Sequence, residues 1–174
     1  MKKLTGVNTL LMTPFSESGA IDLGGIYRQI DRVLEAGVTS VVVQGKIGEY
    51  DTYTMDERRD TARAVVEYVA GRVPVGVGII NAEFDYGLQV GEVARSVGAD
   101  YVMSRPPVEG VISDYFLRLA DIIPVMLYDQ GVRGDLSISD DILPLTEATE
   151  NIICLLYTSP SPRDATLSRM PSSA

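Results

Sequence analysis

The sequence alternates short, uninterrupted apolar runs with longer segments that have the apolar period of an α-helix. The apolar runs predict strands at residues 7–13, 38–44, 74–80, 100–104, 124–128 and 151–155. The helical period predicts helices at residues 22–35, 54–70, 83–97, 113–122 and 139–149. Continuous apolar strands are typical of a parallel sheet that is buried on both faces, and repeats of about 25 to 30 residues suit βαβ crossovers. The chain is therefore expected to be an α/β protein.

The turn after the first predicted strand decides between two parallel architectures. It reads Thr13-Pro14-Phe15-Ser16-Glu17 and lacks the glycine fingerprint of a doubly wound nucleotide-binding sheet. We therefore expect an incomplete (β/α)8 TIM barrel with about five and a half of the eight βα units, because a complete barrel takes about 250 residues. The expected domain is a truncated barrel at residues 1–153. Residues 154–174 turn to serine and proline without any period, which predicts an artefactual or disordered tail.

Composition excludes several kinds of chemistry. Without histidine, Ser-His-Asp catalysis is impossible, and the single cysteine, Cys154, excludes an intramolecular disulfide and a zinc site of His and Cys. We expect no metal and no other cofactor. The net charge of -9 argues against nucleic acid and anionic membranes as partners. No apolar run reaches the roughly 20 residues that span a bilayer, and Met1-Lys2-Lys3 is too short a basic start for a signal peptide. A cytoplasmic location is expected.

The stretch Gly45-Lys46-Ile47-Gly48-Glu49 joins a predicted strand to a predicted helix. Glycines let the backbone approach a ligand closely, and free N–H groups beside a helix start attract anions. In a parallel barrel this loop lies at the C-terminal rim, where active sites of that fold are found. A glycine-bracketed turn is also common without any ligand, so a plain connecting turn is the alternative.

Several short motifs occur in an order that is characteristic of one family. They are Thr13-Pro14-Phe15, Gly45-Lys46-Ile47-Gly48-Glu49, Glu57-Arg58, Gly98-Ala99-Asp100, Pro106-Pro107, Pro124-Val125-Met126-Leu127-Tyr128 and Arg133. In this order and spacing, residues 4–153 resemble the N-terminal part of the dihydrodipicolinate synthase / N-acetylneuraminate lyase family. The resemblance implies a (β/α)8 barrel and a class I aldolase or lyase. It also implies a homotetramer or homodimer and no cofactor.

The resemblance also implies roles for individual residues. A lysine of the sixth strand forms a Schiff base with pyruvate or another 2-oxo acid. Tyr128 matches the tyrosine that moves protons, and the loop at residues 45–49 matches the part of the site that holds the substrate carboxylate. Arg133 matches an arginine that meets a second carboxylate. We expect these residues and Thr13 to lie around one rim of the barrel.

Each role has a simpler alternative. Tyr128 can pack its ring at a strand end with its hydroxyl in water. Lys46 can pair with an anionic substrate or remain a solvated loop lysine. Arg133 can pair with Asp135 on the surface instead of binding substrate. A structural hydrogen bond to loop backbone is the expected role of Glu49.

The chain departs from the family pattern at five positions. Lys46 and Ile47 stand where hydroxyl residues are usual, Val108 replaces a tyrosine, and Asp129 replaces an asparagine. The Schiff-base lysine is expected at about Leu156. The chain has no lysine after Lys46, so the sequence as it stands is predicted to be inactive. A non-catalytic domain that binds small acids, or a pseudoenzyme of the same family, is the alternative to a fragment of a lyase.

Overall fold

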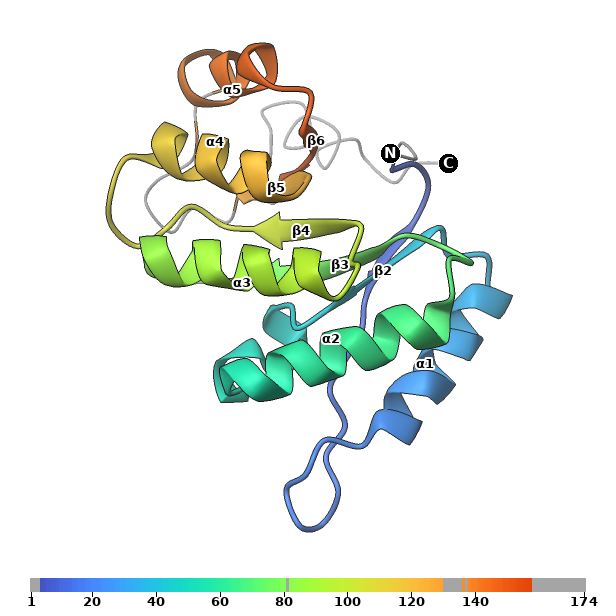
Figure 1. Cartoon of the computed structure of the whole chain (residues 1–174). Coiled ribbons are helices and arrows are strands. Elements are labelled where there is room, and N and C mark those ends of the chain that lie inside the picture. The colour runs from blue at the N-terminus through green and yellow to red at the C-terminus, as the bar shows by residue number, and fades with distance from the viewer. Residues whose placement is uncertain (1–3, 81, 130–135, 137, 158–174) are drawn as a thin grey trace, which may run out of the picture.

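Six parallel strands form one curled sheet in the order in which they occur along the chain (Figure 1). The computed structural model describes residues 4–80, 82–129, 136 and 138–157. The strands are β1 (Asn8–Leu10), β2 (Ser40–Val43), β3 (Val75–Ile79), β4 (Tyr101–Ser104), β5 (Val125–Asp129) and β6 (Ile152–Tyr157). The curl and the parallel order are those of an unclosed barrel, so the predicted fold class, an incomplete (β/α)8 TIM barrel, is confirmed.

Helices follow the strands and lie side by side along one face of the sheet (Figure 1). They are α1 (Leu23–Glu35), α2 (Met55–Val69), α3 (Phe84–Ser96), α4 (Ile112–Ile122) and α5 (Leu143–Ala148). Two short 3-10 turns, Lys46–Gly48 and Tyr50–Thr52, lie between β2 and α2. A π-helical turn, Ile138–Ile142, leads into α5, so the helix expected at residues 139–149 is divided between two geometries.

Two helices, α1 and α2, begin at side-chain caps. The Asp22 carboxylate accepts a hydrogen bond from the Gly25 N–H at 2.9 Å and begins α1. Thr54 and Glu57 form a capping box at the start of α2, with Glu57 Oε2 accepting from the Thr54 N–H at 2.8 Å. Aspartate and threonine are favoured residues at helix starts, and these two caps fix where α1 and α2 begin.

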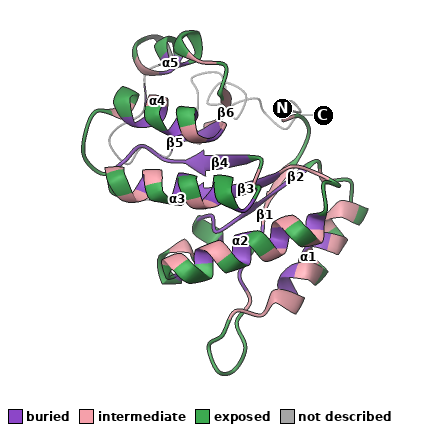
Figure 2. Cartoon of the chain, viewed as in Figure 1, coloured by how far each residue is buried: buried purple, intermediate pink, exposed green. Residues whose placement is uncertain are grey.

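Strands β2 to β5 are buried along their lengths (Figure 2), and the two faces of the sheet bury different side chains. One face packs against the helices, as Val102 of β4 does. The other face carries a separate set of buried side chains, which we call the inner cluster: Val42, Ile80, Tyr101, Met103, Met126 and Tyr128. Because side chains alternate along a strand, Tyr101 and Met103 point inward while Val102 and Ser104 point toward the helices. The inner cluster lines the concave side of the curled sheet.

The sixth strand extends beyond the predicted residues 151–155. It reaches Tyr157 and so crosses the expected domain boundary after residue 153. Its pairing with β5 is interrupted by an irregularity between Val125 and Met126. Residues 158–174 lie outside the described residues. None of the helices described at residues 4–80, 82–129, 136 and 138–157 is long and apolar enough to cross a membrane.

Candidate functional site

The loop after β2 leaves two backbone donors available. Gln44 has a positive φ of 58°, and Gly45 is extended at φ -74° and ψ -177°. The Gly48 N–H donates to the Gly45 carbonyl at 2.9 Å, which closes the first 3-10 turn. The N–H groups of Lys46 and Ile47 precede this bond and have no hydrogen-bond partner within the described part of the chain. Two adjacent free donors are suited to a carboxylate.

Close packing explains both glycines of the loop. A Cβ on Gly45 would lie 2.8 Å from Leu10 Cδ2, beside the inner cluster. A Cβ on Gly48 would lie 2.9 Å from the Leu11 carbonyl oxygen, which is backbone and cannot move aside. The loop is therefore pressed against the end of β1, and any larger residue at position 48 would displace it.

Thr13 ties the end of the first strand to the same loop. Its buried hydroxyl donates to the Gly48 carbonyl at 2.7 Å and lies 2.7 Å from the Tyr53 hydroxyl. A threonine hydroxyl has one hydrogen, so Tyr53 is the donor in the second bond. Because C=O and N–H point in opposite directions across a trans peptide, this bond also fixes the direction of the Glu49 N–H. Burial raises the pKa of Tyr53, while the Thr13 hydrogen bond and the Arg58 charge oppose the rise.

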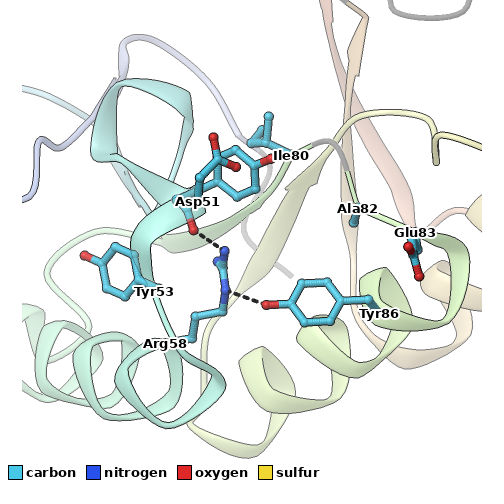
Figure 3. Close-up of a pocket in the computed structure, with 8 residues that line it drawn as sticks. Asp51, Tyr53, Arg58, Ile80, Ala82, Glu83 and Tyr86 are labelled. Atoms are coloured by element: carbon cyan, nitrogen blue, oxygen red, sulfur yellow. Dashed lines mark hydrogen bonds between the residues drawn. The ribbon is translucent and has the colours of Figure 1, made fainter.

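Arg58 of α2 lies behind the loop and is only 2% exposed. Its Nε–H donates to the Tyr86 hydroxyl at 3.1 Å (Figure 3). Its Nη1 donates to Gln44 Oε1 at 3.3 Å. Its Nη2 donates to the Tyr50 carbonyl. The guanidinium carbon also lies 5.5 Å from the ring centroid of Tyr50 and 5.7 Å from that of Tyr53. These contacts hold a permanent positive charge in a mostly aromatic setting.

A cavity of about 380 Å³ opens beside Arg58 (Figure 3). Its lining consists of Tyr50, Asp51, Tyr53, Arg58, Ile80, Ala82, Glu83 and Tyr86. Ile80 belongs to the inner cluster, and Tyr50 packs against that cluster. The cavity therefore adjoins the loop on the side of α2 and α3.

Tyr128 lies on the inner face near the C-terminal end of β5. It is 7% exposed, and the guanidinium carbon of Arg105 lies 5.8 Å from its ring centroid. Arg105 follows β4 and is 6% exposed, which is unusual for a charged side chain. Burial raises the pKa of the Tyr128 phenol above its ordinary value of 10.0, and the Arg105 charge opposes that rise. The parallel strands place Tyr128 and the loop after β2 at the same edge of the sheet.

The other residues named from sequence differ in how far they are buried. Lys46 is exposed and forms no salt bridge in the described part of the chain. Ile47 is 58% exposed, and Glu49 is exposed with φ 54°. Arg133 lies outside the described residues, and its role stays a prediction. Asp129 is buried, and its Oδ2 accepts from the Leu136 N–H at 3.0 Å.

Tyr53 and Arg105, which lie near the site, were not singled out from sequence, and Arg58 was named only within the Glu57-Arg58 motif, without a role. A signal for Arg58 exists, because it precedes Thr61, Ala62, Val65 and Val69 on the buried face of α2. An arginine on the apolar face of a helix indicates a specific hydrogen-bonding task. Arg105 continues the inward alternation of Tyr101 and Met103. Among the described residues, no group of His, Cys, Asp or Glu side chains is arranged to hold a metal ion.

Comparison with known families agrees with this geometry. A profile of the Dihydrodipicolinate synthetase family matches residues 3–164. The chain belongs to this family. This match confirms the family resemblance that the sequence motifs indicate.

Curated relatives are synthases of greater length. The 4-hydroxy-tetrahydrodipicolinate synthase 2 of Streptomyces coelicolor is 33% identical over 145 residues, which cover 79% of this chain and 48% of the relative. The corresponding synthase of Methanococcus vannielii is 32% identical over 167 residues, covering 91% and 57%. The chain thus spans about half the length of the curated relatives it matches.

Solved structures of the family share the fold. A dihydrodipicolinate synthase superposes with a TM-score of 0.85 at 26% identity, covering 94% of this chain and 59% of that one. YagE, a prophage protein of the dihydrodipicolinic acid synthase family from E. coli, was solved in complex with pyruvate. It superposes with a TM-score of 0.83 at 28% identity, covering 90% of this chain and 55% of YagE.

Proposed function

We propose that the chain binds the carboxylate of a 2-oxo acid at the N–H groups of Lys46 and Ile47. The observation that carries this proposal is the pair of adjacent loop donors without partners in the described residues. They lie at the C-terminal edge of a parallel sheet, where ligands of such folds bind. The exposed Lys46 ammonium adds a positive charge at the same place. Together these features suit a small anion.

For the whole protein we propose a class I lyase acting on pyruvate or another 2-oxo acid. In this reaction an amine adds to the ketone and loses water, and the resulting iminium withdraws electrons from the neighbouring bond that breaks or forms. The bond is carbon–carbon or carbon–oxygen. Tyr128 is proposed as the proton shuttle, because its phenol lies on the inner face next to a cation. Arg133 is proposed to meet a second substrate carboxylate.

The family resemblance also supports the remaining parts of the proposal. We include a homodimeric or homotetrameric assembly of the whole protein, without a cofactor. A cytoplasmic location is included because the single cysteine, Cys154, suits a reducing compartment.

Three lost polar groups favour a substrate other than the one used in dihydrodipicolinate synthesis. Lys46 and Ile47 replace loop hydroxyls, and Val108 replaces a tyrosine. Each missing relay or donor costs on the order of a hundredfold in rate when nothing replaces it. We expect the whole protein to turn over 2-keto-3-deoxy sugar acids better than pyruvate with aspartate semialdehyde. A steady-state kinetic panel on these substrates measures this directly.

A second candidate function is a non-catalytic domain that binds small acids. The observation in its favour is Leu156 of β6, which packs against the inner cluster where the family resemblance places a lysine. A leucine cannot form a Schiff base. The binding proposal is common to both candidates, because it depends on the loop and not on a lysine.

Two variants at one position test the binding proposal. Gly45 is extended, which suits the residue before a proline, so Lys46→Pro removes one N–H with little change in the backbone. Lys46→Ala keeps that N–H and removes only the charge. We expect pyruvate to shift the amide resonances of Ile47 in a ¹⁵N-labelled chain. We expect Lys46→Pro to weaken binding by about tenfold or more, since hydrogen bonds to charged groups contribute about 1.5–3 kcal/mol.

The matched variant separates the backbone from the side chain. Lys46→Ala should retain most of the affinity, because an exposed charge in water contributes little. Acetone, which has the ketone but no carboxylate, should cause no shift. Equal pyruvate affinity in Lys46→Pro and Lys46→Ala would mean that the loop N–H groups do not bind the carboxylate.

A further inference from the structure

We infer that Arg58 is a positioning residue, which holds both ends of the 45–49 loop so that the Lys46 and Ile47 N–H groups face the substrate carboxylate. The inference rests on the proposed carboxylate-binding role of that loop. Arg58 itself touches neither donor. It acts through Gln44, which precedes the loop, and through Tyr50, which follows it.

The first anchor is a reciprocal pair of hydrogen bonds. Arg58 Nη1 donates to Gln44 Oε1 at 3.3 Å, and Gln44 Nε2 donates to the Arg58 carbonyl at 2.9 Å. Gln44 is 1% exposed and Arg58 is 2% exposed. Buried amide and guanidinium groups need such partners, so the pair specifies one arrangement of the two side chains.

The backbone of Gln44 shows why this anchor is needed. Its φ of 58° lies in the left-handed region, which few residues other than glycine adopt. Such a conformation persists only where its surroundings hold it. This angle turns the chain from β2 into Gly45 and so sets the direction of the two N–H groups that follow. Because the side chain of Gln44 is bonded to Arg58, α2 holds the turn.

The third strand closes off the space on the other side of this turn. A Cβ on Gly78 of β3 would lie 2.3 Å from the Gln44 carbonyl oxygen and 2.9 Å from the Gly45 Cα. The backbone of the turn therefore touches the backbone of β3, while its side chain is bonded to α2. With both contacts present, the backbone of the turn at Gln44 has little freedom to move. Loss of the Arg58 side chain removes its hydrogen bond to Gln44 and so loosens the contact with α2, while the contact with β3 remains.

The second anchor lies beyond the loop. Arg58 Nη2 donates to the Tyr50 carbonyl, so one guanidinium bonds to the residues on both sides of Gly45–Glu49. The Nε–H bond to the Tyr86 hydroxyl on α3 fixes the plane of the guanidinium (Figure 3). A planar fork with five N–H donors can serve three such partners at fixed angles, whereas a lysine ammonium cannot reproduce that geometry.

The test compares two arginines of the full chain that each donate to a backbone carbonyl and lie over a tyrosine ring, Arg58 being buried and Arg72 exposed. Arg58→Met removes both anchors of the loop. Arg72→Met is the control, because Arg72 also donates to a backbone carbonyl, that of Tyr68 at 2.8 Å, and lies 5.3 Å from the Tyr68 ring centroid. Arg72 precedes β3 and so lies at the opposite end of the sheet. Pyruvate is titrated into each ¹⁵N-labelled protein, and the Lys46 and Ile47 amide shifts give its affinity.

We expect Arg58→Met to bind pyruvate about tenfold more weakly or worse, with Arg58→Lys restoring only part of the affinity. Arg72→Met should bind pyruvate with the affinity of the original chain, even if the variant is less stable and unfolds at a lower urea concentration. A purely structural role for Arg58 would lower the urea midpoint and leave the affinity of the folded protein unchanged, and that result would overturn the inference. Absence of any loop shift in the original chain would instead refute the proposed binding function.

A second variant covers the case in which Arg58→Met does not fold. Gln44→Met keeps the length of the side chain and removes only the reciprocal pair, leaving the Tyr50 and Tyr86 bonds in place. We expect it to weaken pyruvate binding and to move the Gly45 amide resonance. Full pyruvate affinity in Gln44→Met would show that Arg58 does not act through the turn before the loop.

Discussion

Leu156 of β6 pairs in register with Tyr128 of β5, and both side chains belong to the inner face of the sheet. In a parallel pair, residues in register lie at the same height on neighbouring strands. The position beside the phenol is therefore occupied by an aliphatic group that can neither donate nor accept a proton. An amine at residue 156 would lie next to Tyr128 and opposite the loop that is proposed to bind carboxylate.

The first prediction is a gain of Schiff-base chemistry in Leu156→Lys. Partial burial lowers the pKa of a lysine and leaves more of it as the neutral nucleophile. We expect borohydride reduction in the presence of pyruvate to trap an adduct on residue 156, detected by peptide mass spectrometry. The original chain should give no adduct.

Leu155→Lys is the matched control for this gain. Leu155 precedes Leu156 on the same strand but packs against the helix-facing core instead of the inner cluster. It should give no adduct, because its side chain points away from the site. Equal trapping in both variants would refute the positional argument, and an adduct on Lys46 of the original chain would identify a different nucleophile.

The second prediction concerns the charge beside the strand-five phenol. Burial raises the pKa of Tyr128, and the Arg105 guanidinium 5.8 Å from its ring lowers it again. We therefore expect Arg105→Met to raise the Tyr128 pKa further and Arg105→Lys to change it less. NMR titration of chains labelled at tyrosine Cζ measures this, with Tyr128→Phe assigning the resonance.

Arg118→Met is the control for that titration. Arg118 lies over the Phe84 ring, with its guanidinium carbon 5.1 Å from the centroid, on the helical side of the sheet. Arg118→Met should give the same Tyr128 titration curve as the original chain. A lower Tyr128 pKa in Arg105→Met would mean that lost burial outweighs the lost charge, contrary to this prediction.

The fold was predictable because the signals for it are local. Continuous apolar runs gave the parallel strands, and Asp22, Thr54 and Glu57 gave two helix starts that the structure contains. The division near residue 142 was not predictable, since the five residues of the π-helical turn are too few for a sequence period to distinguish them from the α-helix that follows. The sixth strand reaches Tyr157 because the apolar run itself continues through Leu156 and pairs with β5 as far as Tyr157.

The site was predictable only where chemistry lies within a single motif. The two glycines of the loop at residues 45–49 indicate a binding loop from sequence alone. The residues that hold it come from elsewhere in the chain, since Thr13 reaches Gly48 across 35 positions and Arg58 reaches Tyr86 across 28. No local pattern specifies such pairs. They follow from the curl of the sheet, which brings the ends of separate βα units together.

The third prediction is an alkaline loss of stability that depends on buried phenols. Burial raises the pKa of Tyr101 and of Tyr115 to about 12 in the folded chain, against 10.0 for a free phenol. Between these values the unfolded state has lost the proton and the folded state retains it. Stability should therefore be complete below about pH 10 and fall by about 1 kcal/mol per pH unit for each tyrosine up to about pH 12.

Tyr115→Phe tests the sign of this effect. The variant loses the hydrogen bond to the Ser104 hydroxyl, 2.9 Å in the original chain, and should be less stable at neutral pH by about 1 kcal/mol. Its stability should fall less steeply above about pH 10, because one of the two raised phenols is gone. Urea unfolding at a series of pH values measures both. An unchanged alkaline slope would show that Tyr115 does not contribute to it.

The last prediction concerns Thr13, whose hydroxyl joins the Gly48 carbonyl and the Tyr53 hydroxyl. Thr13→Val keeps the shape of the side chain and leaves both partners buried without this bond. We expect a loss of about 1–3 kcal/mol in the free energy of unfolding, and weaker pyruvate binding because the Gly48 peptide is no longer fixed.

Thr13→Ser retains the hydroxyl and should retain the affinity. Tyr53→Phe should have a smaller effect on binding than Thr13→Val, because Thr13 can still donate to Gly48. Urea unfolding and pyruvate titration of the three variants give both quantities, and equal affinity in Thr13→Val and Thr13→Ser would show that this hydroxyl does not position the loop.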